Sequence, residues 1–321
     1  MSVVLRHEPP PHAPEAGWAQ RLLGPFHVTG VFWFRLHRFG VTILPGWAIG
    51  SAVALFTTFF WIVLRRIRAA IAENLEAVLG PCGWWERQRR IYRTFHKFAW
   101  CLSERYERLS TERVFSVEAE GAEGWRETTG NPEGCILVTA HLGAWEVGSM
   151  LASSRDRRRI HVVREAETDP RAQQFIENLI RRRGGELYVT HFAEDPQLGM
   201  DLLDALRQGE VVALQGDRPR SGGRTEPVNL FGRAFHLPIG PAALARAAGV
   251  PIVPVFVFRE GRLSYRCVIR PAIHVAQSAD RRRDVGEALQ RFTADLEAAI
   301  RRDPHQWFCF RSIWPGERRR M

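Results

Sequence analysis

The chain has 321 residues, of which 45% are hydrophobic and 25% are charged. This length suits two domains or one large α/β domain with an appendage, and the composition excludes wholesale disorder and fibrous proteins. The 45 Lys and Arg residues against 35 Asp and Glu residues give a net charge of +10, which favours contact with anionic surfaces such as a phospholipid bilayer. The five cysteines form no CxxC pair, so neither a zinc ribbon nor a disulfide scaffold is expected.

The N-terminal part contains an unusually long apolar stretch. Residues 1–40 are expected to form a Pro-rich tail and an approach segment. Val41–Leu64 then provides 24 residues without a charge, and one helix of that length would span about 36 Å, enough for a hydrocarbon core of about 30 Å. We predict a membrane-embedded helix, either spanning or monotopic, because arginines on both flanks leave its orientation open. The alternative is a buried hairpin of a soluble domain.

Two amphipathic helices are predicted after this stretch. Apolar residues recur at intervals of three and four over Leu64–Val78 and again over Ile91–Leu109, which is the helical period. Gly80 and Pro81 separate the two segments with a stop signal. The region 41–112 is therefore expected to combine the membrane-embedded helix with two amphipathic helices.

Residues 113–321 have the pattern of an α/β domain with a C-terminal helix and a basic tail. Short β-branched runs alternate with helical stretches, which predicts a mixed, mostly parallel central sheet flanked by helices. The candidate strands are Cys135–Ala140, Ile160–Val163, Glu186–Thr190, Val211–Gln215, Pro251–Phe258 and Ser264–Arg270. The candidate helices are Trp145–Ser153, Pro170–Arg183, Leu198–Gln208, Pro241–Ala248 and Arg283–Arg302.

The sharpest chemical motif lies where the first of these strands ends. An apolar strand leads to His141, Gly143 permits a tight turn, and Glu146 follows five positions after the histidine. A histidine at a strand end and a glutamate early in the next helix can meet across the turn. Glu146 would then accept a hydrogen bond from one ring nitrogen and leave the other as a general base. The alternative is a structural histidine with a glutamate at a helix N-terminus.

A second charged block follows another apolar strand. Gln215, Gly216, Asp217 and Arg218 come directly after Val211–Gln215, and sites in open α/β sheets collect at the carboxyl ends of strands. Asp217 and Arg218 are expected either to pair with each other or to contact substrate.

Together these blocks resemble the bacterial lipid A biosynthesis (late) acyltransferases, within the lysophospholipid and glycerolipid acyltransferase group, and their relatives the phosphatidylinositol mannoside acyltransferases. The resemblance runs from about residue 41 to 315. The matching segments are His141–Glu146, Gln215–Arg218, Glu226 ahead of Val228–Gly232, Pro238–Pro254, Gln306–Phe308 and Trp314–Pro315. One departure is Ala140, where many members carry a polar residue.

The resemblance implies a membrane-bound O-acyltransferase in the bacterial cell inner membrane, with its catalytic domain facing the cytoplasm. His141 would be the general base and Glu146 would orient it. The donor would be an acyl-acyl carrier protein or an acyl-CoA, with no bound cofactor and no metal. No G-x-S-x-G elbow is present in the sequence, so direct transfer to a hydroxyl is expected. The candidate substrate-binding residues are Arg164, Arg181, Arg182, Asp217, Arg218 and Glu226.

Two other functions compete with acylation of a lipid A precursor. The acceptor could instead be a phosphatidylinositol mannoside, an aminolipid or another membrane lipid. A protein of another class, an inactive membrane lipid-binding protein, would keep the same fold without the chemistry. Nucleic-acid binding is not expected, because the aromatic residues do not interleave with basic ones as they do in an RNA-binding sheet. The sequence does not specify the acyl chain length.

Overall fold

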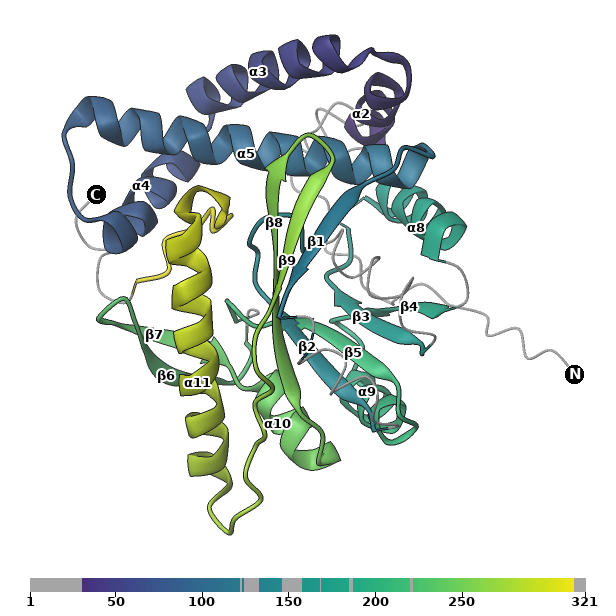
Figure 1. Ribbon diagram of the computed structural model, residues 1–321, viewed down its shortest axis with the longest axis vertical. Helices are drawn as coiled ribbons and strands as arrows, with labels where there is room; N and C mark the ends of the chain where they lie inside the picture. Colours follow the sequence, from purple (N-terminus) through teal and green to yellow (C-terminus); the bar gives the residue numbers. More distant parts are fainter. Residues whose placement is uncertain are drawn as a thin grey trace, which may run out of the picture.

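The computed structural model describes residues 31–121, 123, 133–145, 158–167, 169–184, 187–219 and 222–314. The fold is α/β, as predicted: a group of N-terminal helices is followed by a seven-stranded sheet with further helices against it. In Figure 1 the N-terminal helices lie together across one end of the sheet, at the top of the view.

The N-terminal helices differ from the prediction in one respect. The uncharged stretch Val41–Leu64 is not one helix, because α2 (Val31–Ile43) ends before Pro45 and α3 (Gly46–Val63) begins after it. Pro45 is extended, with φ −66° and ψ 157°, and proline cannot donate the backbone hydrogen bond that would continue a helix through it. The 18 residues of α3 span about 27 Å. Helix α2 also places residues 31–40, expected to be an approach segment, in regular structure.

Helix α3 is apolar around most of its circumference and exposes most of its large side chains. Only one stripe, Ile49, Val53 and Thr57, is buried, at the four-residue spacing of a single helix face, and α3 packs on α5 (Trp84–Ser110). The exposed fraction reaches 78% for Trp47. Within the described residues, α3 is the one helix long and apolar enough to cross a membrane.

The two predicted amphipathic helices are present as α4 (Arg65–Leu79) and α5. Between them Gly80 has a φ of +76°, a conformation that glycine adopts without steric cost. Two fully buried carboxylates on α5, Glu104 and Glu107, accept hydrogen bonds from Arg259 (2.9 Å) and Arg262 (2.7 Å) respectively. These charged bonds join α5 to the strands of the sheet.

The sheet has the order β1-β9-β8-β2-β5-β3-β4. The five strands from β8 to β4 run parallel to one another, while β9 is antiparallel to β8 and β1 is parallel to β9. The central strand β2 carries four consecutive buried residues, as a parallel strand covered on both faces should. The strands are β1 (Ser116–Glu120), β2 (Cys135–Thr139), β3 (Ile160–Arg164), β4 (Tyr188–Phe192), β5 (Val211–Gln215), β8 (Ile252–Gly261) and β9 (Ser264–Ile269).

All six predicted strands are found, within a few residues at each end, and three more were not predicted. These are β1 and the antiparallel pair β6 (Thr225–Leu230) and β7 (Arg233–Pro238), which form a separate two-stranded sheet. The predicted helix Trp145–Ser153 lies outside the described residues except for Trp145. The remaining helices are α8 (Pro170–Gly184), α9 (Leu198–Arg207), α10 (Gly240–Ala248) and α11 (Arg281–Arg302).

The main hydrophobic core lies on one face of the sheet. There α9, α10, α11 and the β6–β7 pair pack side chains such as Leu206, Leu237 and Leu296 against Ile136 of β2 and Phe256 of β8. Figure 1 shows α11 and the β6–β7 pair together on the left of the sheet. This packed core fixes the position of β2 and β5 from one face of the sheet.

Candidate active site

Two neighbouring strands bring the central pair of side chains together. β2 and β5 are parallel and in register, with Thr139 opposite Gln215, so the residues that follow them emerge at the same edge of the sheet. The Gly216 N–H donates to the Thr139 carbonyl at 2.8 Å and extends this pairing beyond the strands. The Nδ1–H of His141 then donates to Oδ1 of Asp217 at 2.8 Å. The Nδ1 proton is assigned because a carboxylate only accepts.

Gly216 permits the close approach of the two chain segments. A Cβ atom at this position would lie 2.6 Å from a Val138 side-chain carbon and 3.0 Å from the ring of Phe292. Any larger residue would push the segment after β5 away from β2, and the carboxylate of Asp217 away from His141.

Asp217 is a buried anion. Only 2% of the residue is exposed, and this burial by itself would raise its pKa. The charge of His141, the hydrogen bond to its ring and the charge of Arg218 outweigh burial, and they lower the pKa of Asp217 from 3.8 to about 2. Within the described residues its second oxygen, Oδ2, has no hydrogen-bond partner. Asp217 is therefore ionised at neutral pH and can stabilise a positive charge on the imidazole ring.

Among the described residues, only one nitrogen of His141 has a hydrogen-bond partner. The side chain is 16% exposed, and the described part of the chain offers no hydrogen-bond partner to Nε2. With Nδ1 protonated and held by Asp217, Nε2 carries the lone pair. The ring centroid lies 5.2 Å from that of Trp145, so one side of the imidazole is covered by an aromatic group.

The loop that carries His141 is clamped by residues near the end of the chain and by β8. The N–H of Phe308 donates to the carbonyl of His141, and the N–H of Gly143 donates to the carbonyl of Gln306, each at 2.8 Å. From the other direction the Ala144 N–H donates to the carbonyl of Val257, also at 2.8 Å. The position of the histidine is thus set by backbone hydrogen bonds from two distant segments.

Gly143 is required by this clamp. Its φ is +59°, and a Cβ atom there would lie 2.0 Å from the carbonyl oxygen of Val257 and 3.0 Å from Oε1 of Gln306. The amide of Gln306 is itself fixed, since it accepts from the N–H of Arg259 and donates to its carbonyl, both at 2.9 Å. The closing Gln306–Phe308 segment therefore has a positional role around His141.

Asp217 is the partner that the sequence analysis did not assign. Its carboxylate was placed there among the substrate-binding candidates or in a pair with Arg218, and the structure shows it hydrogen-bonded to the His141 ring. Glu146, the expected partner, lies outside the described residues, so its contact with His141 stays a prediction. The signal for Asp217 was its place two residues after a buried strand that neighbours β2.

The other predicted substrate-binding residues lie on separate elements. Arg164 ends β3, and Glu226 on β6 binds Nε of Arg282 at 3.1 Å. Arg181 belongs to α8, and its side chain is not among those that the structure describes. Arg182 is exposed and lines a groove of about 560 Å³ between α2 and α8. The structure therefore groups His141 with Asp217 and Arg218, and places Arg182 at a second feature.

Comparison with known proteins places the chain in a family. The family model of bacterial lipid A biosynthesis acyltransferases matches residues 26–315. Phosphatidylinositol mannoside acyltransferases from two Mycobacterium tuberculosis strains (CDC 1551 / Oshkosh and ATCC 25618 / H37Rv) are each 25% identical over 181 residues, which cover 56% of this chain and 54% of theirs. The chain thus spans about half the length of the curated relatives it matches.

Among solved structures, the 1-acyl-sn-glycerophosphate acyltransferase of Thermotoga maritima aligns with a TM-score of 0.35 and 14% identity, over 78% of this chain and 94% of that one. The family model, by contrast, covers nearly the whole chain and includes the clamped His141 loop, the Asp217 segment and the closing Gln306–Phe308 segment. On this match, the chain belongs to the bacterial lipid A biosynthesis acyltransferase family.

Proposed function

We propose that the protein transfers a fatty acyl group from an acyl thioester to a hydroxyl of a membrane lipid, with His141 as the general base. The observation that carries this proposal is the pair in which buried Asp217 holds Nδ1 of His141, so that Nε2 is the nitrogen with the lone pair. A base of this kind contributes about 10²–10⁴ to the rate of proton transfer from a hydroxyl.

The chemistry follows from the pair. Nε2 of His141 takes the proton of the acceptor hydroxyl while its oxygen attacks the thioester carbonyl, and Asp217 stabilises the imidazolium that forms. The tetrahedral intermediate then breaks its carbon–sulfur bond. The departing thiolate accepts this proton from Nε2. The products are an ester and a free thiol. The base is neutral again for the next turnover.

The developing oxyanion needs a donor other than the first backbone groups of the turn. The N–H groups of Gly143 and Ala144 already donate to Gln306 and Val257, so they are not available. Arg218, half-buried and near enough to Asp217 to lower its pKa, is the candidate that adjoins the pair. An arginine at this point would also attract the phosphate of an acyl carrier protein or acyl-CoA donor.

The proposed membrane attachment rests on α3. Its exposed apolar side chains would be costly in water, and Trp84 and Trp85, 61% and 81% exposed at the start of α5, are residues that favour the membrane–water interface. We place the enzyme at the bacterial inner membrane with the site on the cytoplasmic side, where thioester donors are made. The alternative of a buried hairpin fits poorly with the exposure of α3.

The preferred acceptor is a lipid A precursor, because the family model is named for that pathway. A phosphatidylinositol mannoside is the second candidate, supported by the names of the two curated relatives. An inactive lipid-binding protein has no need of a buried carboxylate aimed at an accessible histidine.

Mass spectrometry of total lipids tests the proposal. Cells without the gene, cells with it and cells carrying His141→Ala should be compared. We expect one lipid to gain the mass of one acyl group only with the intact gene, and its headgroup identifies the acceptor. If His141→Ala restores that lipid in full, His141 is not the base.

A further inference from the structure

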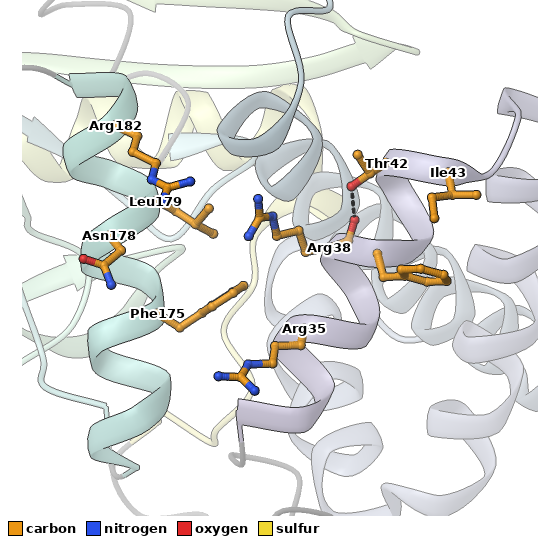
Figure 2. Close-up of a pocket in the computed structure, with 9 residues that line it drawn as sticks. Arg35, Arg38, Thr42, Ile43, Phe175, Asn178, Leu179 and Arg182 are labelled. Carbon is orange, nitrogen blue, oxygen red and sulfur yellow. Dashed lines mark hydrogen bonds between the residues drawn. The ribbon is translucent and has the colours of Figure 1, made fainter.

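The groove between α2 and α8 is a second candidate site. It has a volume of about 560 Å³, within the usual range for small-molecule sites. Arg35 and Arg38 reach into it from α2, and Arg182 extends toward them from α8 (Figure 2). Asn178 of α8 also lines the groove. Three cationic side chains from two helices therefore converge on one space.

Within the described residues, no carboxylate forms an ion pair with Arg35, Arg38 or Arg182 of this groove. Two carboxylates on or beside α8 bind other groups: Asp169 accepts from the Val31 N–H at 2.9 Å, and Glu177 accepts from Gln173 at 2.7 Å. Three guanidinium groups around one space, with no paired carboxylate in the described part of the chain, favour a bound anion.

The groove is apolar as well as cationic. Phe175 and Leu179 contribute to its α8 side, and the guanidinium carbon of Arg38 lies 5.8 Å from the centre of the Phe175 ring. On the α2 side Phe39 and Ile43 line it and are 62% and 63% exposed. A small soluble anion would leave these side chains uncovered, whereas an amphiphile would cover them.

We propose that this groove binds the phosphate of an anionic membrane lipid, with the acyl chains passing over Phe39 and Ile43. Guanidinium groups bind phosphate through paired hydrogen bonds, and Asn178 adds a further donor. The exposed apolar residues continue from α2 into α3, so a lipid in the groove could keep its chains in the bilayer. This inference goes beyond the proposed function and does not depend on the role of His141.

A titration of the full-length protein in uncharged detergent micelles tests the proposal. The probes are dihexanoyl phosphatidate, dihexanoyl phosphatidylcholine, glycerol 3-phosphate and inorganic phosphate. We expect phosphatidate to bind at least about tenfold more tightly than the other three, since only it combines an uncompensated phosphate with apolar chains. Equal binding of glycerol 3-phosphate or inorganic phosphate would overturn the lipid as the occupant.

Two double variants separate a built site from diffuse attraction. Arg38→Ala with Arg182→Ala should weaken phosphatidate binding by about thirtyfold, from the usual contribution of a basic residue at an anionic lipid. Arg38→Lys with Arg182→Lys keeps the charge but loses the paired hydrogen bonds, and should still weaken binding by roughly fivefold. Wild-type binding by the lysine variant would show diffuse attraction and refute the proposal.

A matched control removes the same charge elsewhere. Arg207 on α9 and Arg291 on α11 are both exposed, and α9 lies at the end of the sheet away from α2 in Figure 1. Arg207→Ala with Arg291→Ala should bind phosphatidate as the wild type does. A loss as large as that of the groove variant would mean that net charge alone governs binding, which contradicts a site between α2 and α8.

Discussion

Replacing Asp217 by Asn removes the charge behind His141 while keeping the shape of the side chain. The carboxylate is 2% exposed and bonded to Nδ1 at 2.8 Å, so the amide would fill the same space. It would no longer stabilise an imidazolium, and it could hold the ring in the wrong tautomer by donating to Nδ1. We expect kcat/KM to fall by about 10²–10⁴.

The cost in stability should not unfold the protein. Lowering the pKa of Asp217 from 3.8 to about 2 corresponds to about 2 kcal/mol. Because the folded-state pKa is the lower one, this stability is present well above pH 3.8 and is lost as the pH falls through about 2. A domain stabilised by about 5–15 kcal/mol remains folded without it at neutral pH.

We would obtain kcat/KM from initial rates of acyl transfer, measured with the acceptor found by lipid mass spectrometry. Thermal unfolding followed by circular dichroism measures the stability. Asp204→Asn is the matched control, because Asp204 is 59% exposed and lies 3.7 Å from Arg207 in a surface pair. It should leave both quantities unchanged. Asp217→Asn with wild-type kcat/KM, beside an inactive His141→Ala, would refute the reasoning.

Three further predictions concern the same site and the membrane helix. His141→Ala should abolish transfer with an unchanged circular dichroism spectrum, whereas Glu146→Gln should lose less; an active, folded His141→Ala enzyme would exclude the histidine as base. Gly143→Ala should destabilise the fold by roughly 1–3 kcal/mol and reduce activity, since the new Cβ would meet the carbonyl of Val257 at 2.0 Å; a wild-type melting temperature would contradict the clamp. The full-length protein should remain in the membrane fraction through high-salt and alkaline washes, and removing residues 1–64 should reduce this retention; equal solubility of the two proteins without detergent would show that α3 is a core helix.

The sequence predicted the strands that carry apolar or β-branched runs. β5 was predicted at its observed limits and β2 to within one residue, because runs such as Ile136–Val138 have no polar alternative. β1 was missed because it is an exposed, acidic strand that pairs only with β9. Strands of this kind are stabilised by their neighbour rather than by their own composition.

The β6–β7 hairpin was missed for a different reason. Its turn residues, Phe231 and Gly232, both have positive φ, 53° and 74°, as a type I′ turn needs. Asn-Gly is the usual signal for that turn, and phenylalanine is unusual in this conformation. The Phe231 N–H donates to the Glu297 carboxylate of α11. This tertiary hydrogen bond helps to offset the conformational cost of a phenylalanine at positive φ, and the local sequence does not reveal it.

The histidine could be predicted from its local motif, but its observed partner could not. His141 stands at the end of a recognisable strand, and Glu146 is five residues away in sequence. Asp217 is 76 positions away, and its approach depends on β5 lying next to β2 in register. That neighbour relation is a property of the whole sheet, because β3 and β4 intervene in the chain yet lie beyond β5.

The Gln306–Phe308 segment has a consequence for the order of events during synthesis. Every strand of the sheet is made before it, so a nascent chain can complete the sheet and the Asp217 segment while the His141 loop still lacks two of its backbone hydrogen bonds. In an emerging chain, His141 would thus not yet be held in its final position. Premature termination ahead of residue 306 should accordingly yield proteins that do not transfer acyl groups.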